Sequence, residues 1–118
     1  MEGCAHADRG MRSEWIPKEK IPDPHSVQLW LSVNDHMRQE DSTSLMLFRI
    51  PEMLSEISQV MTLEEGDVVL TGTPKGVGTV SEGDVMRAGL RVDGREVEEG
   101  RIEVGVRNRG GLYHFIED

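Results

Sequence analysis

The chain has 118 residues, enough for one domain or part of one, and a formal net charge of -9. This charge argues against nucleic acid and anionic membrane as partners, because both bind clustered Lys and Arg. No stretch approaches the roughly 18 apolar residues of a membrane-spanning helix, and the single cysteine, Cys4, excludes an internal disulfide and fits a reducing compartment.

Residues 1–14 carry neither a targeting signal nor the periodicity of an ordered element. They contain no apolar h-region, so they do not form a secretory signal. Arg9 and Arg12 are offset by acidic neighbours, which argues against a transit peptide. We predict a disordered leader at 1–14 and an ordered region at 15–118.

The first ordered element is predicted to be a β-hairpin. Apolar side chains alternate with others over residues 27–33, which is the period of a strand. Asn34 and Asp35 tolerate the left-handed backbone conformation that a tight turn requires. The chain should therefore return as a second strand through residues 37–39.

A helix is predicted next. Pro51 lies where a helix accepts proline, in its first turn. Apolar residues follow at helical spacing from Ile50 to Met61, where the helix should end. Its methionine-rich face is typical of a core stripe or of a surface that contacts a partner.

In the rest of the chain, Glu-Gly pairs recur at a regular spacing. Glu-Gly pairs at 65–66, 82–83 and 99–100 lie 17 residues apart, and each leads into an apolar run. These runs predict strands that begin near Val68, Val85 and Ile102, with Asp93-Gly94 as a further tight turn. The fold class that follows is mainly β (α+β), with one amphipathic helix.

The segment 70–78 is the strongest candidate for a binding site. Its three glycines and one proline suit a loop whose backbone approaches another group closely. Thr71, Thr73 and Lys75 could donate hydrogen bonds to an anionic or carbonyl group. A phosphate loop is disfavoured, because no Gly-Lys-Ser/Thr sequence ends the segment and no helix follows it. A plain glycine turn remains the alternative.

Two groups of residues have the composition of a metal site. Cys4, His6 and Asp8 occupy alternate positions, but the predicted leader offers no rigid scaffold for them. Glu96 and Glu98 would lie on one side of a strand and could bind a hard cation. Solvated acidic side chains are the favoured interpretation of that pair in a chain of charge -9.

Catalytic residues are harder to find. No sequence neighbour of His25, His36 or His114 forms a catalytic pairing, and a capping or surface role is favoured for His25. No serine lies in a Gly-x-Ser-x-Gly elbow, and Cys4 belongs to the leader. Nucleophilic catalysis therefore has no candidate.

Six motifs follow one another along the chain: Pro17-Lys18-Glu19-Lys20-Ile21-Pro22-Asp23-Pro24-His25, Leu29-Trp30-Leu31-Ser32-Val33-Asn34, Arg38-Gln39, Thr43-Ser44-Leu45-Met46-Leu47-Phe48, Thr62-Leu63-Glu64-Glu65-Gly66-Asp67 and Thr71-Gly72-Thr73-Pro74-Lys75-Gly76-Val77-Gly78. In this order they resemble the motifs of the fumarylacetoacetate hydrolase (FAH) superfamily, most closely its acylpyruvase or oxaloacetate decarboxylase (tautomerase) branch. The resemblance covers Trp15 to about Gly89 and weakens beyond Leu90.

The resemblance implies a mixed β-roll, usually dimeric, that holds Mg²⁺ or Mn²⁺ with three carboxylates and acts on a 2-oxo acid. The metal supplies Lewis-acid stabilisation of an enolate. Thr73 matches the family threonine that hydrogen-bonds the substrate, and Gly72 allows the close approach. Gln39 and Thr43 match recurrent family positions, to which the sequence assigns no chemical role.

The family's metal-binding carboxylates, its His–Glu pair and its lysine belong to an amino-terminal half that residues 1–14 do not match. Residues 15–118 are therefore expected to be the carboxy-terminal part of an FAH-like catalytic domain. We expect substrate-binding residues Thr73 and Gly72, no catalytic residue, no metal ligand and no activity of the chain alone.

Two other functions are consistent with the sequence. The chain could be a non-catalytic partner that docks onto a full-length relative, or a β-rich binding module that binds a ligand at Thr73 without metal. A homo-oligomer is also expected from the family. Family relatives occur in mitochondria and cytosol, and the leader favours neither compartment.

Overall fold

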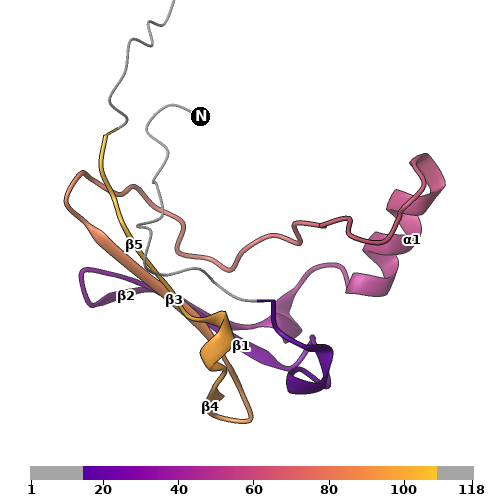
Figure 1. Ribbon diagram of the computed structural model, residues 1–118, viewed down its shortest axis with the longest axis horizontal. Coiled ribbons are helices and arrows are strands. Elements are labelled where there is room, and N and C mark those ends of the chain that lie inside the picture. The colour runs from indigo at the N-terminus through magenta and orange to yellow at the C-terminus, as the bar shows by residue number, and fades with distance from the viewer. Residues whose placement is uncertain (1–14, 109–118) are drawn as a thin grey trace, which may run out of the picture.

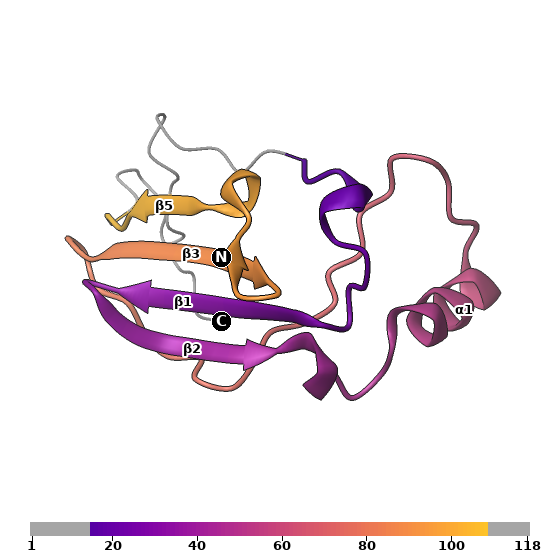
Figure 2. The same cartoon turned by 90° about the horizontal axis from the view of Figure 1, so that it is seen from below.

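The computed structural model describes residues 15–108, which build one five-stranded antiparallel sheet. The strands are β1 (Val27–Val33), β2 (His36–Ser42), β3 (Val85–Val92), β4 (Arg95–Glu96) and β5 (Ile102–Gly105). Their order is β2-β1-β3-β4, and β5 also pairs with β3 (Figure 1, Figure 2). The described helices are the α-helix α1 (Ile50–Val60) and the 3-10 helices η1 (Lys18–Lys20), η2 (Thr43–Leu45) and η3 (Glu98–Gly100). The mainly β fold class with one amphipathic α-helix is confirmed.

The first hairpin forms as predicted. Asn34 and Asp35 both have positive φ, 51° and 65°, as a type I′ turn requires. The return strand β2 is longer than the predicted 37–39. The register shifts by one residue between Leu31 and Ser32, so that Arg38 has no partner across the pair. This β-bulge changes the direction in which the side chains of β2 point.

The strand β3 lies at the centre of the sheet, because it pairs with β1 along seven residues and with β5 along four. Two predicted strand starts, Val85 and Ile102, are confirmed. Asp93 and Gly94, with φ of 51° and 79°, form the predicted turn between β3 and β4.

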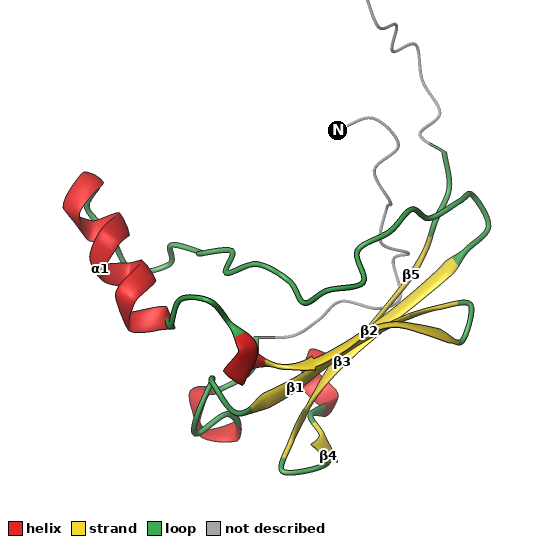
Figure 3. Ribbon diagram, turned by 180° about the vertical axis from the view of Figure 1, so that it is seen from behind, coloured by secondary structure: helices red, strands yellow, loops and turns green. Residues whose placement is uncertain are grey.

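The predicted strand at Val68 is wrong. Residues 61–84 form a long connection that contains no described helix or strand (Figure 3). Val68 is 67% exposed and Leu70 is 93% exposed. An apolar run becomes a strand only when another strand pairs with its backbone, and residues 15–108 offer this run no such partner.

One side-chain cluster joins the first hairpin to the start of β3. The Asn34 amide accepts a hydrogen bond from the backbone N–H of Val85 and donates one to Asp84. Asp84 also accepts a hydrogen bond from the Ser81 backbone N–H at 2.8 Å. These hydrogen bonds, that from Ser81 first, lower the pKa of Asp84 below its ordinary value of 3.8, because they stabilise the ionised carboxylate.

The helix α1 also forms as predicted, with proline in its first turn and its last residue one position before Met61. It stands away from the sheet, and none of its residues is buried (Figure 1). Of the two interpretations of its methionine-rich face, packing in the core of residues 15–108 is wrong. The buried apolar side chains of that core are Val27 and Val33 of β1, Val97 just before η3 and Val106 just after β5.

Among residues 15–108, no helix has both the length and the apolar character needed to cross a membrane.

Candidate functional site

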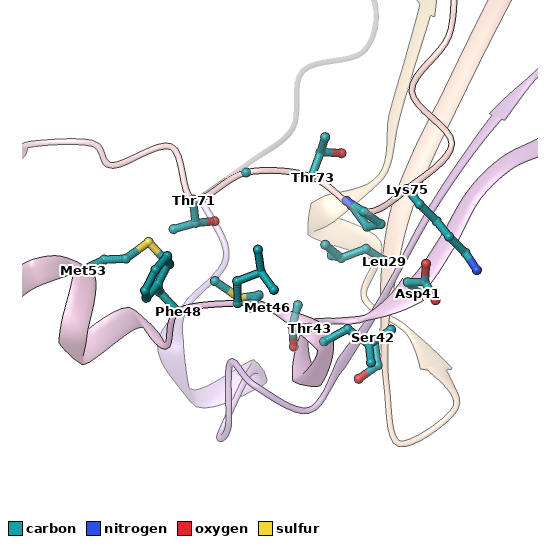
Figure 4. A pocket seen from close by; sticks show the side chains of 14 residues that line it. Leu29, Asp41, Ser42, Thr43, Met46, Phe48, Met53, Thr71, Thr73 and Lys75 are labelled. Atoms are coloured by element: carbon teal, nitrogen blue, oxygen red, sulfur yellow. The ribbon is translucent and has the colours of Figure 1, made fainter.

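A cavity of about 500 Å³ lies where the sheet, the start of α1 and the long connection meet (Figure 4). Its lining is mainly apolar and includes Leu29 of β1, Met46, Phe48 and Met53 of α1. Cavities that bind small molecules commonly combine such a lining with a few polar groups that fix the orientation of the ligand.

Half of the polar side chains in the lining are Asp41, Ser42 and Thr43, and the other half come from the connection. We call its residues 71–78 the threonine loop, and Thr71, Gly72, Thr73 and Lys75 of this loop all line the cavity. The structure thus places both predicted substrate-binding residues, Thr73 and Gly72, at one cavity. Gly72 has φ of 104°, and a Cβ atom there would meet nothing within 4 Å. A glycine is needed at this position for its backbone conformation and not for lack of space.

The close backbone approach in the threonine loop occurs at Gly76, and it is made to β2. A Cβ atom on Gly76, whose φ is 102°, would collide with the carbonyl oxygen of Arg38. The guanidinium of Arg38 then donates a hydrogen bond to the Thr79 carbonyl oxygen at 3.2 Å. Gly76 therefore seats the loop on the sheet, a function that the sequence did not distinguish from approach to a ligand.

Gln39 and Thr43, which the sequence left without a role, both make structural hydrogen bonds at the cavity. The Gln39 side-chain amide donates to the Thr73 hydroxyl at 3.0 Å and to the Pro74 carbonyl oxygen. The Thr43 hydroxyl accepts from the Val27 backbone N–H at 3.0 Å and donates to the Pro24 carbonyl oxygen at 2.7 Å. A polar residue at an inward position of a strand was the sequence signal that could have pointed to Gln39.

His25 has the capping role that the sequence favoured. Its Nε2 accepts a hydrogen bond from the backbone N–H of Ile50, the first residue of α1, at 3.0 Å. This N–H has no acceptor within the helix, so the imidazole satisfies it. His36 lies exposed at the start of β2, and His114 lies outside the described residues.

The predicted arrangement of Glu96 and Glu98 is wrong. The strand β4 ends at Glu96, and Glu98 belongs to η3, so the two do not share one side of a strand. Glu96 is also not simply solvated, because it accepts hydrogen bonds from the Trp30 indole N–H at 3.0 and 3.1 Å. Arg91 lies 3.3 Å from the same carboxylate.

The described residues do not fit the metal that the family resemblance implies. No three His, Cys, Asp or Glu side chains within 15–108 lie close enough together to hold an ion. Mg²⁺ and Mn²⁺ prefer several oxygen ligands, and the cavity presents one carboxylate, Asp41. The alternate residues Cys4, His6 and Asp8, like the predicted disordered leader, lie outside the described residues.

The sequence of this chain is similar to those of curated proteins over most of its length. The chain is 60% identical over 78 residues to the mitochondrial oxaloacetate tautomerase FAHD1 of Bos taurus, an alignment that covers 66% of this chain and 35% of that protein. It is 59% identical over 75 residues to the mitochondrial oxaloacetate tautomerase oaa1 of Schizosaccharomyces pombe, covering 64% and 34%. The chain thus spans about a third of the length of these curated relatives.

Solved structures also superpose on this chain. Yeast ynq8, a fumarylacetoacetate hydrolase family protein, superposes with a TM-score of 0.79 at 33% identity, over 86% of this chain and 44% of that one. Maleylpyruvate hydrolase from Sphingobium sp. SYK-6, in complex with manganese (II) ion and pyruvate, superposes with a TM-score of 0.64 at 39% identity, over 75% and 31%. The family model for the fumarylacetoacetate (FAA) hydrolase C-terminal region matches residues 6–106. The chain therefore belongs to the fumarylacetoacetate hydrolase family and corresponds to its C-terminal portion.

Proposed function

We propose that the cavity binds the carboxylate or keto oxygen of a small 2-oxo acid, with the Thr73 hydroxyl as the principal hydrogen-bond donor. The observation that carries this proposal is that Thr73 lines the cavity and that its hydroxyl accepts a hydrogen bond from Gln39. Gly72, with φ of 104°, precedes Thr73, and Lys75 adds a positive charge to the same lining. The pyruvate in the maleylpyruvate hydrolase complex supports the choice of substrate class.

The proposed chemistry of the complete catalytic domain is the hydrolysis, decarboxylation or tautomerisation of acylpyruvates, oxaloacetate or related 2-oxo acids. The oxaloacetate tautomerases that resemble this chain support it. The manganese ion of the maleylpyruvate hydrolase complex supports Mg²⁺ or Mn²⁺ as the cofactor. Carboxylates to hold that ion would have to come from outside residues 15–108, since these residues bring no three ligands together. The 118-residue chain alone is then a binding surface without activity.

Calorimetric titration of the purified chain with oxalate, a stable analogue of a 2-oxo acid, tests the binding proposal. Thr73→Val removes the hydroxyl and keeps the shape, so it should weaken oxalate binding about tenfold, the value of one hydrogen bond to a charged group. Thr62→Val is the matched control, because Thr62 does not line the cavity. Equal affinities for Thr73→Val and the original chain would refute the role of Thr73.

Addition of Mg²⁺ separates the full catalytic site from a binding surface. We expect that Mg²⁺ leaves the oxalate affinity of this chain unchanged and that acetylpyruvate is not cleaved. Mg²⁺-dependent cleavage of acetylpyruvate by the purified chain would contradict the proposed inactivity. A β-rich binding module unrelated to the family chemistry would also bind oxalate without Mg²⁺. It would differ in that adding a full-length relative would not yield acetylpyruvate cleavage that depends on this chain.

A second candidate function is a non-catalytic partner that docks onto a full-length relative or a second copy of the chain. The exposed apolar side chains favour it: Leu45, Leu47 and Phe48 are 66%, 94% and 64% exposed in the segment that precedes α1. Apolar patches of this kind mark interaction sites. Gel filtration of the chain alone and with a full-length relative tests the idea, and a monomer that ignores the relative counts against it.

The compartment is proposed to be mitochondrial or cytoplasmic. The mitochondrial relatives support the first alternative, and fractionation of cells that express the tagged chain would decide between the two.

A further inference from the structure

The threonine loop is held by side chains of one strand. Among the described residues, no backbone–backbone hydrogen bond involves positions 68–80. Two consecutive residues of β2, Arg38 and Gln39, instead donate side-chain hydrogen bonds to these positions. Neighbouring residues of a regular strand point to opposite faces, and the β-bulge at Arg38 removes that restriction. The position of Thr73 is therefore set from β2.

The chemistry of Pro74 determines which way the Gln39 amide points. The Pro74 carbonyl oxygen can only accept a hydrogen bond, so it must face the NH₂ group of Gln39 and not the amide oxygen. That NH₂ group has two hydrogens, and the Thr73 hydroxyl oxygen lies 3.0 Å from the same nitrogen. One hydrogen goes to Pro74 and the other to Thr73, so Thr73 is the acceptor in this pair.

A hydroxyl that accepts from one side keeps its own proton for another partner. The nitrogen of Gln39 cannot take this proton, because both of its hydrogens are already donated. Thr73 is exposed and belongs to the cavity lining, so its proton stays available to water or to a ligand bound there. Gln39 itself is only 9% exposed, which prevents water from replacing its amide.

We propose that Gln39 is a positioning residue that makes Thr73 a hydrogen-bond donor toward the cavity. The threonine loop then recognises ligand groups that accept hydrogen bonds, such as a carboxylate or a keto oxygen, and rejects groups that only donate. This inference rests on the proposed function, since it explains how Thr73 selects the substrate class. It assigns a role to Gln39, which does not line the cavity itself.

The first test reverses the polarity of the pair. In Gln39→Glu the introduced carboxylate accepts the Thr73 proton and repels the Pro74 carbonyl oxygen, so oxalate binding at about pH 7 should fall about tenfold or more. Gln28→Glu makes the same change of charge on β1, outside the cavity, and should bind as the original chain does. Thermal unfolding of each variant shows whether it is folded.

A pH profile separates this role from a merely structural one. At about pH 4.5 the introduced carboxyl of Gln39→Glu becomes partly protonated and regains a hydrogen to donate. The deficit in oxalate affinity, taken relative to Gln28→Glu at the same pH, should therefore shrink. A deficit that stays constant with pH, or binding by Gln39→Glu equal to the original chain at about pH 7, would overturn the inference while leaving the proposed function intact.

A second measurement does not depend on a ligand. Gln39→Met keeps the length of the side chain and removes both donors, so the rate of proteolytic cleavage within residues 71–78 should rise by about tenfold, as expected when two hydrogen bonds of ordinary strength are lost. Gln28→Met should leave this rate unchanged. Failure of the original chain to bind oxalate would refute the proposed function, and an unchanged cleavage rate in Gln39→Met would refute the positioning role.

Discussion

Gly76 offers the sharpest test of how the threonine loop sits on the sheet. With φ of 102°, it occupies backbone space that other residues rarely adopt, and its missing Cβ leaves room for the Arg38 carbonyl oxygen. Gly76→Ala therefore meets two penalties: backbone strain of about 1–3 kcal/mol, and a collision with backbone that has no flexible end to move aside. The loop must lift from β2 to relieve the collision.

The cost of the collision can be estimated from the hydrogen bonds that break when the loop lifts from β2. Gln39 donates two hydrogen bonds to the loop, and each is worth about 0.5–1.5 kcal/mol. Detachment should thus add about 1–3 kcal/mol to the strain, unless the loop detaches without affecting the rest of the domain. In that second case the free energy of unfolding changes little, but proteolytic cleavage within residues 71–78 becomes faster.

Gly66→Ala is the matched control, because Gly66 has a similar φ of 92° but a Cβ atom there would meet nothing within 4 Å. It carries the strain without the collision. Urea unfolding and limited proteolysis of both variants separate the two penalties. If Gly76→Ala and Gly66→Ala gave the same unfolding free energy and the same rate of cleavage within 71–78, the proposed seating of the loop on Arg38 would be wrong.

Three further predictions concern the sheet and the helix. Because the folded-state pKa of Asp84 is lowered, its contribution to stability is present above the ordinary value of 3.8 and is lost as the pH falls through the folded-state pKa. Lowering the pH below about 4 should therefore reduce the free energy of unfolding, measured with urea, more in the original chain than in Asp84→Asn, and equal losses would contradict this role of Asp84. Gly89→Ala should cost about 1–3 kcal/mol, because its Cβ would lie 2.8 Å from the Trp30 ring; Gly105→Ala, in open space on β5, should cost clearly less, and equal costs would contradict the packing. His25→Ala should destabilise α1 by about 0.5–2 kcal/mol through loss of the acceptor for Ile50, seen as faster exchange at the helix start, whereas an unchanged rate would argue against the cap.

Local patterns in the sequence predicted local structure well. Asn34-Asp35 and Asp93-Gly94 form turns because their residues tolerate positive φ, a preference that depends on the residue and its neighbours alone. Pro51 and the apolar spacing after it predicted α1 for the same reason. The prediction of a strand at Val68 failed, because a strand needs a partner and periodicity does not supply one.

Only part of the candidate site could be predicted from the sequence. The family motif identified Thr73 and Gly72, and both line the cavity. The role of Gln39 could not be predicted, because its partners lie 34 and 35 residues away along the chain. The pairing of Glu96 with Trp30, 66 residues apart, was missed for the same reason. Distances in space between such residues depend on the path of every element between them.

By itself, the sequence determined the two tight turns, the helix, the mainly β class and the family to which the chain belongs, since each follows from short runs of residues or from motifs in order. The tertiary structure alone decided that Gly76 seats the threonine loop on β2 and that Gln39 donates a hydrogen bond to the Thr73 hydroxyl. The physical reason is that a side-chain hydrogen bond requires two groups within about 3 Å in a suitable direction, and only the folded path of the chain brings β2 and the threonine loop that close.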